Sequence, residues 1–409
     1  MNVPNADAPA SEWLVYADAL QQKGEPLGEF IALLNTGDAA KRDAWLQKNG
    51  AALLGELAGS LGDGLSLEWK WGFIEKATVK SSEAGKIGSI VTTLLAHPRA
   101  ERLGTLSVVA VPGADDAVID LTDLVARIGS DKTPPALELI DDRAANCTTL
   151  TSRDFDPAAN LVNFGPLNTL WKSLRSLKLV VADVRQLTLG AINAPELESL
   201  TIHGLRLAAQ AYGDNEPCEA ADALGQAKLP KLKHFDMRLN EEWTVNHVDD
   251  TDSYTTHDSY PEDDFDDGYS EGANWENEFG AALKNLTSSP LERLALTNFA
   301  SVDSLLGVIG QNVLPATLKE LDLSESSLAG ANVAWFTQHQ KQLSKIKKLV
   351  VKETGITDED ANTLKKIFEV VEHSEKSPRP AIDGQDEEEA EEEGRGVPLP
   401  KYRYTVGME

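Results

Sequence analysis

The sequence predicts an α/β fold in which stacked repeats build an open, curved parallel sheet with helices on its convex side. Three observations support this prediction. The apolar spacing L-x-x-L-x-L recurs seven times between residues 103 and 351. Three of the steps between consecutive copies are 23, 27 and 28 residues long. Amphipathic segments lie between the copies, and a unit that cannot bury its own apolar face must stack on its neighbours.

The first segment, residues 1–75, does not contain the repeat and is predicted to form a helical cap. Trp13 and Leu20 share one face of a helix. Gly24 follows that helix in the position where a left-handed residue often ends one, and Pro26 can open the next helix. Because an uncapped repeat sheet exposes its core, we expect these helices to close the N-terminal end.

Residues 76–371 are predicted to form the repeats, each with a short strand whose alternate residues point inward. A period of 20–29 residues with this apolar spacing is typical of leucine-rich repeats. The strands are expected at Leu103/Leu106/Val108, Leu174/Leu177/Leu179, Leu197/Leu200/Ile202, Leu232/Phe235/Met237, Leu291/Leu294/Leu296, Leu318/Leu321/Leu323 and Ile346/Leu349/Val351, with a degraded copy at Pro134/Leu137/Leu139. The return helices are expected over residues 85–96, 118–128, 275–286, 302–309 and 333–343, and a helical cap over residues 354–371.

The net charge of -28 is concentrated in two segments. Residues 241–280 contain 14 acidic and no basic side chains, and residues 381–395 contain eight acidic side chains and one arginine. The remaining 354 residues carry an ordinary net charge of -7. Dense like charges repel one another and cannot bury a core. We therefore expect an exposed acidic insert at residues 241–274 and an acidic C-terminal tail at residues 372–409.

Composition also excludes several classes of protein. The acidity argues against binding to nucleic-acid phosphates or to anionic membranes, because both need clustered basic side chains. The sequence shows no membrane-spanning apolar run and no secretory leader. It has two cysteines, Cys147 and Cys218, which favours a reducing compartment over a disulfide framework. We therefore expect a cytoplasmic protein.

The N-terminal residues carry a family resemblance. Residues 12–20 read EWLVYADAL, residues 24–34 read GEPLGEFIALL, and residues 67–74 read LEWKWGFI. Together they resemble the repeat-companion segment that precedes leucine-rich repeats in bacterial proteins of the myxobacterial and planctomycete type. Ala19 stands where that family usually has Trp, and Leu27 stands where it usually has Arg. The resemblance implies an interaction protein and supplies neither a reaction nor catalytic residues.

No common catalytic motif is present. The sequence lacks H-E-x-x-H, C-x-x-C, G-x-S-x-G, Walker A and G-x-G-x-x-G, so we expect no enzyme activity, no metal site and no cofactor. An enzyme whose residues converge only in space is the alternative. Asp18 and Glu29 could form a carboxylate pair or lie on solvated faces. Trp69, Trp71 and Phe73 could form a ligand platform or the apolar strand that seals the end of the sheet.

Aromatic side chains alternate with carboxylates within the acidic insert. Such a segment can anchor on a basic, partly apolar protein surface, and its charge would steer the encounter. Two other interpretations stay open: a solvated loop that only confers solubility, and weak calcium binding through oxygen ligands, although Gly268 does not give EF-hand spacing. The candidate partner-binding residues are Tyr254, Tyr260, Asp263, Asp264, Phe265, Asp266, Asp267 and Tyr269.

The sequence therefore predicts a non-enzymatic scaffold or regulatory protein. It would bind a protein partner with a basic surface through the concave repeat surface and the acidic insert. A sensor or protease-cleaved regulator, with the insert or the tail as the cleavable element, is the alternative function. The sequence leaves open whether residues 397–409, which regain apolar and aromatic character, fold back on the body, and it leaves the oligomeric state open.

Overall fold

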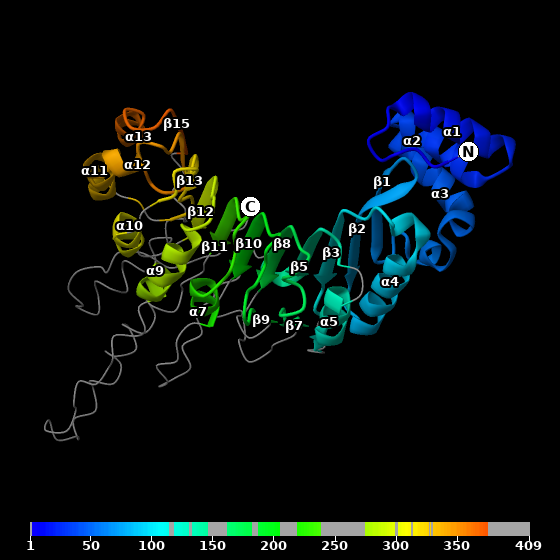
Figure 1. Cartoon of the computed structure of the whole chain (residues 1–409), viewed down its shortest axis with the longest axis horizontal. Helices are drawn as coiled ribbons and strands as arrows, with labels where there is room; N and C mark the ends of the chain where they lie inside the picture. The colour runs from blue at the N-terminus through cyan, green and yellow to red at the C-terminus, as the bar shows by residue number, and fades with distance from the viewer. Residues whose placement is uncertain are drawn as a thin grey trace, which may run out of the picture.

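The computed structural model describes residues 2–113, 118–130, 133–145, 162–181, 187–204, 219–238, 275–298, 302–311, 314–326, 328 and 330–374. These residues form a mixed α/β structure around one 11-stranded, mostly parallel sheet, which curves into an arc (Figure 1). The sheet is open, because the strand order begins at β1 and ends at β15 without pairing these two strands.

The N-terminal end of the arc carries the predicted helical cap. It consists of α1 (Ala10–Gln22), α2 (Pro26–Thr36), α3 (Ala39–Leu54) and the 3-10 helix η1 (Gly55–Ser60). The chain then forms an antiparallel hairpin of β1 (Leu65–Lys70) and β2 (Phe73–Ser81). Since β2 crosses the expected boundary at residue 75, the cap joins the repeats through a continuous strand.

From β2 onward the strands follow one another in sequence order, and every neighbouring pair in the large sheet is parallel. Two small pairs of strands, β4–β6 and β7–β9, lie outside that sheet. The strands are β3 (Thr105–Ala110), β4 (Ile119–Asp120), β5 (Ala136–Asp141), β6 (Val162–Asn163), β7 (Gly165–Pro166), β8 (Ser176–Val181), β9 (Leu187–Thr188), β10 (Ser199–Gly204), β11 (His234–Arg238), β12 (Arg293–Thr297), β13 (Glu320–Asp322), β14 (Lys348–Val351) and β15 (Val370–His373).

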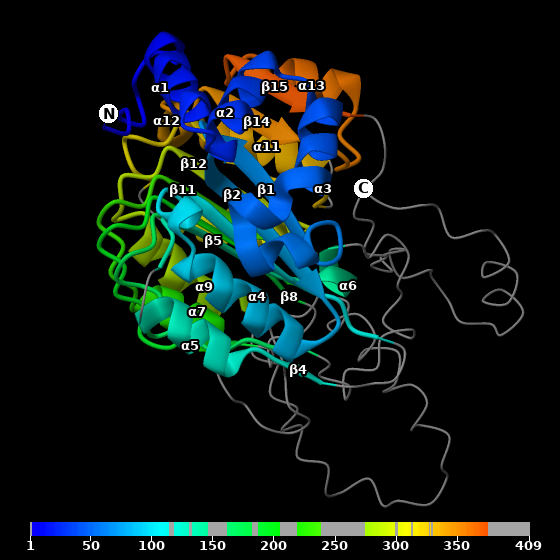
Figure 2. The ribbon, with the colours of Figure 1, turned by 90° about the vertical axis from the view of Figure 1, so that its right-hand side faces the viewer.

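The connecting segments contain helices that gather on the outer side of the arc. Figure 2 looks along the arc from its N-terminal end and shows α4, α5, α7 and α9 on one side of the strands. The helices are α4 (Ala84–Ala96), η2 (Pro98–Ala100), α5 (Thr122–Ser130), α6 (Asp142–Ala145), α7 (Glu219–Gly225), α9 (Trp275–Leu286), α10 (Val302–Gln311), α11 (Gly330–Gln338), α12 (Gln340–Leu343) and α13 (Asp358–Leu364).

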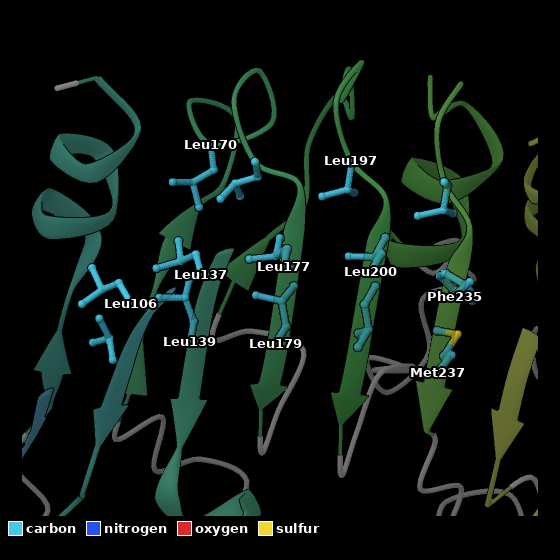
Figure 3. Close-up of a cluster of buried hydrophobic side chains, with 14 of the residues drawn as sticks. Leu106, Leu137, Leu139, Leu170, Leu177, Leu179, Leu197, Leu200, Phe235 and Met237 are labelled. Carbon is cyan, nitrogen blue, oxygen red and sulfur yellow. The ribbon is translucent and has the colours of Figure 1, made fainter. Parts of the chain in front are cut away.

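The second leucine of each L-x-x-L-x-L copy forms one continuous buried row across the sheet. Its members pair directly with one another in the strand register, as part of the row in Figure 3 shows. All copies found in the sequence, including the degraded one at β5, therefore take the predicted alignment. With one further residue from β2 and one from β15, the row consists of Ala77, Leu106, Leu137, Leu177, Leu200, Phe235, Leu294, Leu321, Leu349 and Val371, all of them buried except Val371, which is half-buried.

Two of the predicted helices are shorter than expected. The helix expected over residues 118–128 begins only at Thr122, because Ile119 and Asp120 pair with β6. The cap expected to be helical over residues 354–371 ends its helix at Leu364 and returns to the sheet as β15. Pairing with β14 satisfies backbone groups of Val370–His373, and this tertiary interaction overrides the helical spacing of the apolar side chains.

The long step between the fourth and fifth leucine repeats adds no strand to the large sheet. Residues 239–274 separate β11 from α9, yet β11 pairs directly with β12. The segment predicted as an acidic insert is thus an insertion between two neighbouring strands. Its residues 241–274 lie outside the described part of the chain.

We expect Leu321→Ala to lower the free energy of unfolding by about 2–5 kcal/mol, because the side chain lies in the middle of the apolar row and is fully buried. Val15→Ala is the control: Val15 is 57% exposed, so the change should stay within about 0.5 kcal/mol. Urea unfolding followed by circular dichroism measures both values. A loss below about 1 kcal/mol for Leu321→Ala would contradict its position in the core.

Gly28→Ala should destabilise the cap by about 1–3 kcal/mol, because helices α1 and α2 leave no space for a methyl group there. A Cβ atom at Gly28 would lie 2.4 Å from the carbonyl oxygen of Ala17. Gly88→Ala in α4 is the matched control, since a Cβ there meets nothing within 4 Å. The control should be neutral or stabilising, because alanine favours helix more than glycine does. Equal melting temperatures for the two variants would refute the close packing of α1 on α2.

Candidate functional site

The second face of the sheet carries the side chains that alternate with the apolar row. Side chains of successive residues in a strand point to opposite faces, and the helices seen in Figure 1 lie along the outer side of the arc. We call the inner surface the polar sheet face. Its central row consists of Thr78, Ser107, Glu138, Lys178, Thr201, Asp236, Ala295, Asp322, Val350 and Glu372, which pair in register.

Arg293 on β12 is the centre of an ion-pair network on this face. Its guanidinium donates to Asp236 on one neighbouring strand (3.1 Å) and to Glu320 (2.9 Å) and Asp322 (2.9 Å) on the other. Burial alone would lower the pKa of Arg293, but the surrounding carboxylates outweigh burial and raise it. The planar fork of arginine N–H groups allows one cation to hold three carboxylates in fixed positions.

The network continues toward β10 through Asp236. The Nε2 atom of His203 lies 3.2 Å from an Oδ atom of Asp236. Burial alone would raise the pKa of Asp236, but the hydrogen bond and charge of His203, together with Arg293, outweigh burial and lower it. Asp236 is therefore an ionised bridge between a histidine and an arginine on two different strands.

On the other side of Arg293, the network reaches β15 through Lys348. The Nζ atom of Lys348 lies 3.6 Å from Glu320 and 2.8 Å from Glu372. Lys352 lies 2.8 Å from the second oxygen of Glu372. The hydrogen bonds from Lys348 and Lys352 lower the pKa of Glu372 to about 2. Charged side chains are thus linked across the six strands from β10 to β15.

Two glutamates next to this network have a left-handed backbone. Glu325 has φ 63° and Glu353 has φ 56°, and Asn298 takes the same conformation (φ 60°) at the equivalent place after β12. Asn adopts this region readily, whereas Glu does so at a cost of about 1–2 kcal/mol. The N–H of Asn298 donates to Ser324 (3.0 Å) and that of Glu325 to Lys352 (2.8 Å), so pairing between neighbouring units holds the conformation.

Glu325 lies on the polar sheet face and forms an ion pair with Arg238, the last residue of β11. Burial is the largest influence on this carboxyl and raises its pKa. The charge of Arg238 opposes that rise, and the negative charge of Glu353 adds to it. The carboxyl ends of β11, β13 and β14 thus bring two acidic side chains and one basic side chain together.

The sequence-predicted partner-binding residues lie outside the described part of the chain. They are Tyr254, Tyr260, Asp263, Asp264, Phe265, Asp266, Asp267 and Tyr269. The described chain leaves β11 at Arg238 immediately before this segment. In the sequence the acidic insert therefore follows the carboxyl end of β11, whose last residue, Arg238, forms an ion pair with Glu325.

The other sequence-predicted candidates lie in the N-terminal cap. Asp18 on α1 and Glu29 on α2 are both exposed. The ring of Trp71 stacks on Trp13 with 5.8 Å between centroids. Trp69 packs edge-on against Phe30, and Phe73 is buried beneath the guanidinium of Arg102. This packing fits the sealing role for the tryptophan-rich hairpin.

Sequence reasoning missed the ion-pair network, although part of its signal was present. Asp236 occupies the place between the second and third apolar residues of its L-x-x-L-x-L copy, as Glu372 does in β15. Alternation places these residues on the opposite face from the leucines. A row of charged residues at this place therefore predicts a polar face, but the pattern does not tell which charges touch.

Within the ranges that the structure describes, no group of three or more His, Cys, Asp or Glu side chains is placed to hold a metal ion. Among the described helices, none is both long and apolar enough to span a bilayer.

Comparison with known proteins gives little further information. No protein-family model matches the chain, and no curated protein matches it. One similar solved structure is the crystal structure of a Bacteroides fragilis protein determined as a structural genomics target. It is 15% identical over 72% of this chain and 72% of that chain, with a TM-score of 0.48. A likeness of this size carries no argument about function.

We expect Asp236→Asn to destabilise the protein most near neutral pH. A carboxyl whose pKa is lowered by folding contributes its full stability at pH values above the pKa of the unfolded chain, which is about 3.9 for Asp. That contribution disappears as the pH falls through the lower pKa that Asp236 has in the folded protein. Urea unfolding of the parent and the variant at a series of pH values should therefore show two free energies that converge in acid. A difference that stays constant down to the lowest pH would show that Asp236 gains nothing from His203 and Arg293.

Proposed function

We propose that this chain is a leucine-rich-repeat protein with a repeat-companion cap, and that it binds a protein partner across its polar sheet face. Three features support the repeat assignment. The apolar spacing recurs seven times, with three steps of 23 to 28 residues, each copy contributes one parallel strand, and the second leucines form one row. The residues that resemble the companion segment build the cap at one end of the sheet.

The ordered charge network on the polar sheet face is the observation that supports binding most directly. The network links six neighbouring strands, and its side chains are held by partners in the same protein. Side chains already fixed before a partner arrives lose little conformational entropy on binding. A broad open face of this kind suits a protein or peptide, whereas a small molecule needs a closed apolar pocket.

Charge favours a basic partner. Along β10–β15 and their carboxyl ends, the polar sheet face carries six acidic and four basic side chains. The acidic insert, which follows β11 at the same end of the strands, adds further negative charge. Nucleic acid and anionic membranes would be repelled by this surface. The charged residues are Asp236, Glu320, Asp322, Glu325, Glu353 and Glu372, with Arg238, Arg293, Lys348 and Lys352.

The test is capture of the partner from the native host with the full chain as bait, followed by mass spectrometry. Thr201→Arg places a bulky side chain in the central row of the polar sheet face, next to Asp236 in register. Ser89→Arg places the same side chain on the exposed side of α4, on the outer side of the arc. We expect Thr201→Arg to weaken capture about tenfold or more, equivalent to ~1.4 kcal/mol, and Ser89→Arg to leave it unchanged.

A third variant distinguishes binding by the acidic insert from binding by the polar sheet face. In this variant, residues 254–269 are replaced by a Gly/Ser linker of equal length. Weaker capture by this variant and by Thr201→Arg supports a shared surface, and binding should then fall with salt. Weaker capture by the linker variant alone would show that the insert binds without the face. Unchanged capture by both would refute the proposal.

A further inference from the structure

One ion pair on the polar sheet face reaches across a strand. Arg238 is the last residue of β11, Glu325 follows β13, and β12 lies between these two strands. The guanidinium of Arg238 and the carboxylate of Glu325 nevertheless form an ion pair, which we call the Arg238–Glu325 bridge. Thr297, the register partner of Arg238 on β12, is only 9% exposed. The bridge therefore joins two strands that do not pair with each other.

The surroundings of the Glu325 carboxyl favour its neutral form. Burial is the largest influence and raises its pKa, and the negative charges of Glu353 after β14 and of Asp322 on β13 add to that rise. The charges of Arg238 and of His203, its register partner on β10, oppose the rise without cancelling it. Burial disfavours a charged carboxyl because the protein interior solvates it less well than water does. The acidic member of the bridge is thus a group that takes up a proton readily.

Two other carboxyl groups of the polar sheet face hold their charge more firmly. Burial alone would raise the pKa of Asp236, but its basic neighbours outweigh burial and lower it. Hydrogen bonds from Lys348 and Lys352 lower the pKa of Glu372 to about 2. As the pH falls, Glu325 therefore takes up a proton while Asp236 and Glu372 are still ionised.

Protonation of Glu325 weakens the bridge. Hydrogen bonds with a charged partner are roughly twice as strong as those between neutral groups. The backbone of Glu325 is left-handed, with φ 63°, which is an unfavourable conformation for glutamate. Its N–H donates to the carbonyl of Lys352 in the next unit (2.8 Å). Loss of the bridge therefore removes one of the contacts that hold this residue in an unfavourable conformation.

We propose that the Arg238–Glu325 bridge is a proton-controlled contact of the polar sheet face. It joins β11 to β13 near neutral pH, and it opens on acidification while Asp236 and Glu372 keep their charges. Opening removes one negative charge from the face at the carboxyl ends of the strands and leaves the network around Arg293 in place. The inference does not depend on the partner-binding role proposed above.

A double-mutant cycle at a series of pH values tests the bridge. It compares the melting temperatures of the full chain with Arg238→Gln, with Glu325→Gln, with both and with neither, so that the other interactions of Arg238 cancel. Near neutral pH we expect the two substitutions to be non-additive by a few degrees. The non-additivity should disappear as the pH falls, once Glu325 is neutral in the parent chain.

The matched control is a second cycle on the same face, with Lys348→Gln and Glu372→Gln. Its non-additivity should persist to lower pH, because the pKa of Glu372 is about 2. Additive substitutions at Arg238 and Glu325 near neutral pH would overturn the proposal. Loss of non-additivity at the same pH in both cycles would overturn it as well, because Glu325 would then hold its charge as firmly as Glu372.

The single variants give a second readout, in which the two glutamates have opposite signs. Ionised Glu325 costs stability above its raised folded pKa, and this cost disappears as the pH falls to the unfolded value of about 4.3. The melting temperature of Glu325→Gln relative to the parent should therefore be higher near neutral pH than in acid. That of Glu372→Gln should be lower near neutral pH, because ionised Glu372 adds stability that is lost as the pH falls from about 4.3 through about 2. The same direction in both variants would contradict the proposal.

Glu353→Gln separates a proton-controlled contact from a purely structural one. It removes a charge that raises the pKa of Glu325, so the bridge should open at a lower pH in this background. Glu12→Gln removes an exposed carboxylate on α1 and should leave the pH of opening unchanged. Opening at the same pH in the two backgrounds would refute the proposal, because the charges around Glu325 would then not control the bridge.

Discussion

Each unit of this protein depends on its neighbours to bury its apolar residues. The second leucine of every repeat packs between the equivalent residues of the strands before and after it, so the row from Ala77 to Val371 is continuous. This constraint explains why both ends of the sheet need special treatment. The tryptophan-rich hairpin and helices α1–α3 close the first end. At the last end, Val371 of the row is half-buried, and Val370 beside it is 47% exposed.

The same alternation that buries the leucines creates the polar sheet face. Strands about 4.8 Å apart place equivalent side chains within reach of one another. Arg293 therefore contacts carboxylates on both neighbouring strands, and Lys348 continues the chain of ion pairs to Glu372. The ion pairs around Arg293 are partly buried, whereas those of Glu372 with Lys348 and Lys352 are more exposed. Their effect here is to fix the positions of charges on an open surface, and fixed charges favour selective binding of a complementary partner.

The two acidic segments join the sheet at different places. The insert follows the carboxyl end of β11, beside the ion pair of Arg238 with Glu325. The acidic tail follows β15, at the free end of the apolar row. Residues 241–274 and 375–409 lie outside the described part of the chain.

The sequence by itself determined the strand alignment and the helical cap, because apolar spacing and period follow from which side chains must be buried. That β11 pairs directly with β12 across the long step between their repeats was decided by the tertiary structure. The sequence misjudged the last unit, where Val370–His373 pairs with β14 although its apolar residues have helical spacing. It could not identify the network around Arg293. Asp236 and Arg293 are 57 residues apart, with the acidic insert between them. Their contact exists only because β11 and β12 lie side by side, and that adjacency is decided by burial of the leucine row rather than by the charged residues themselves.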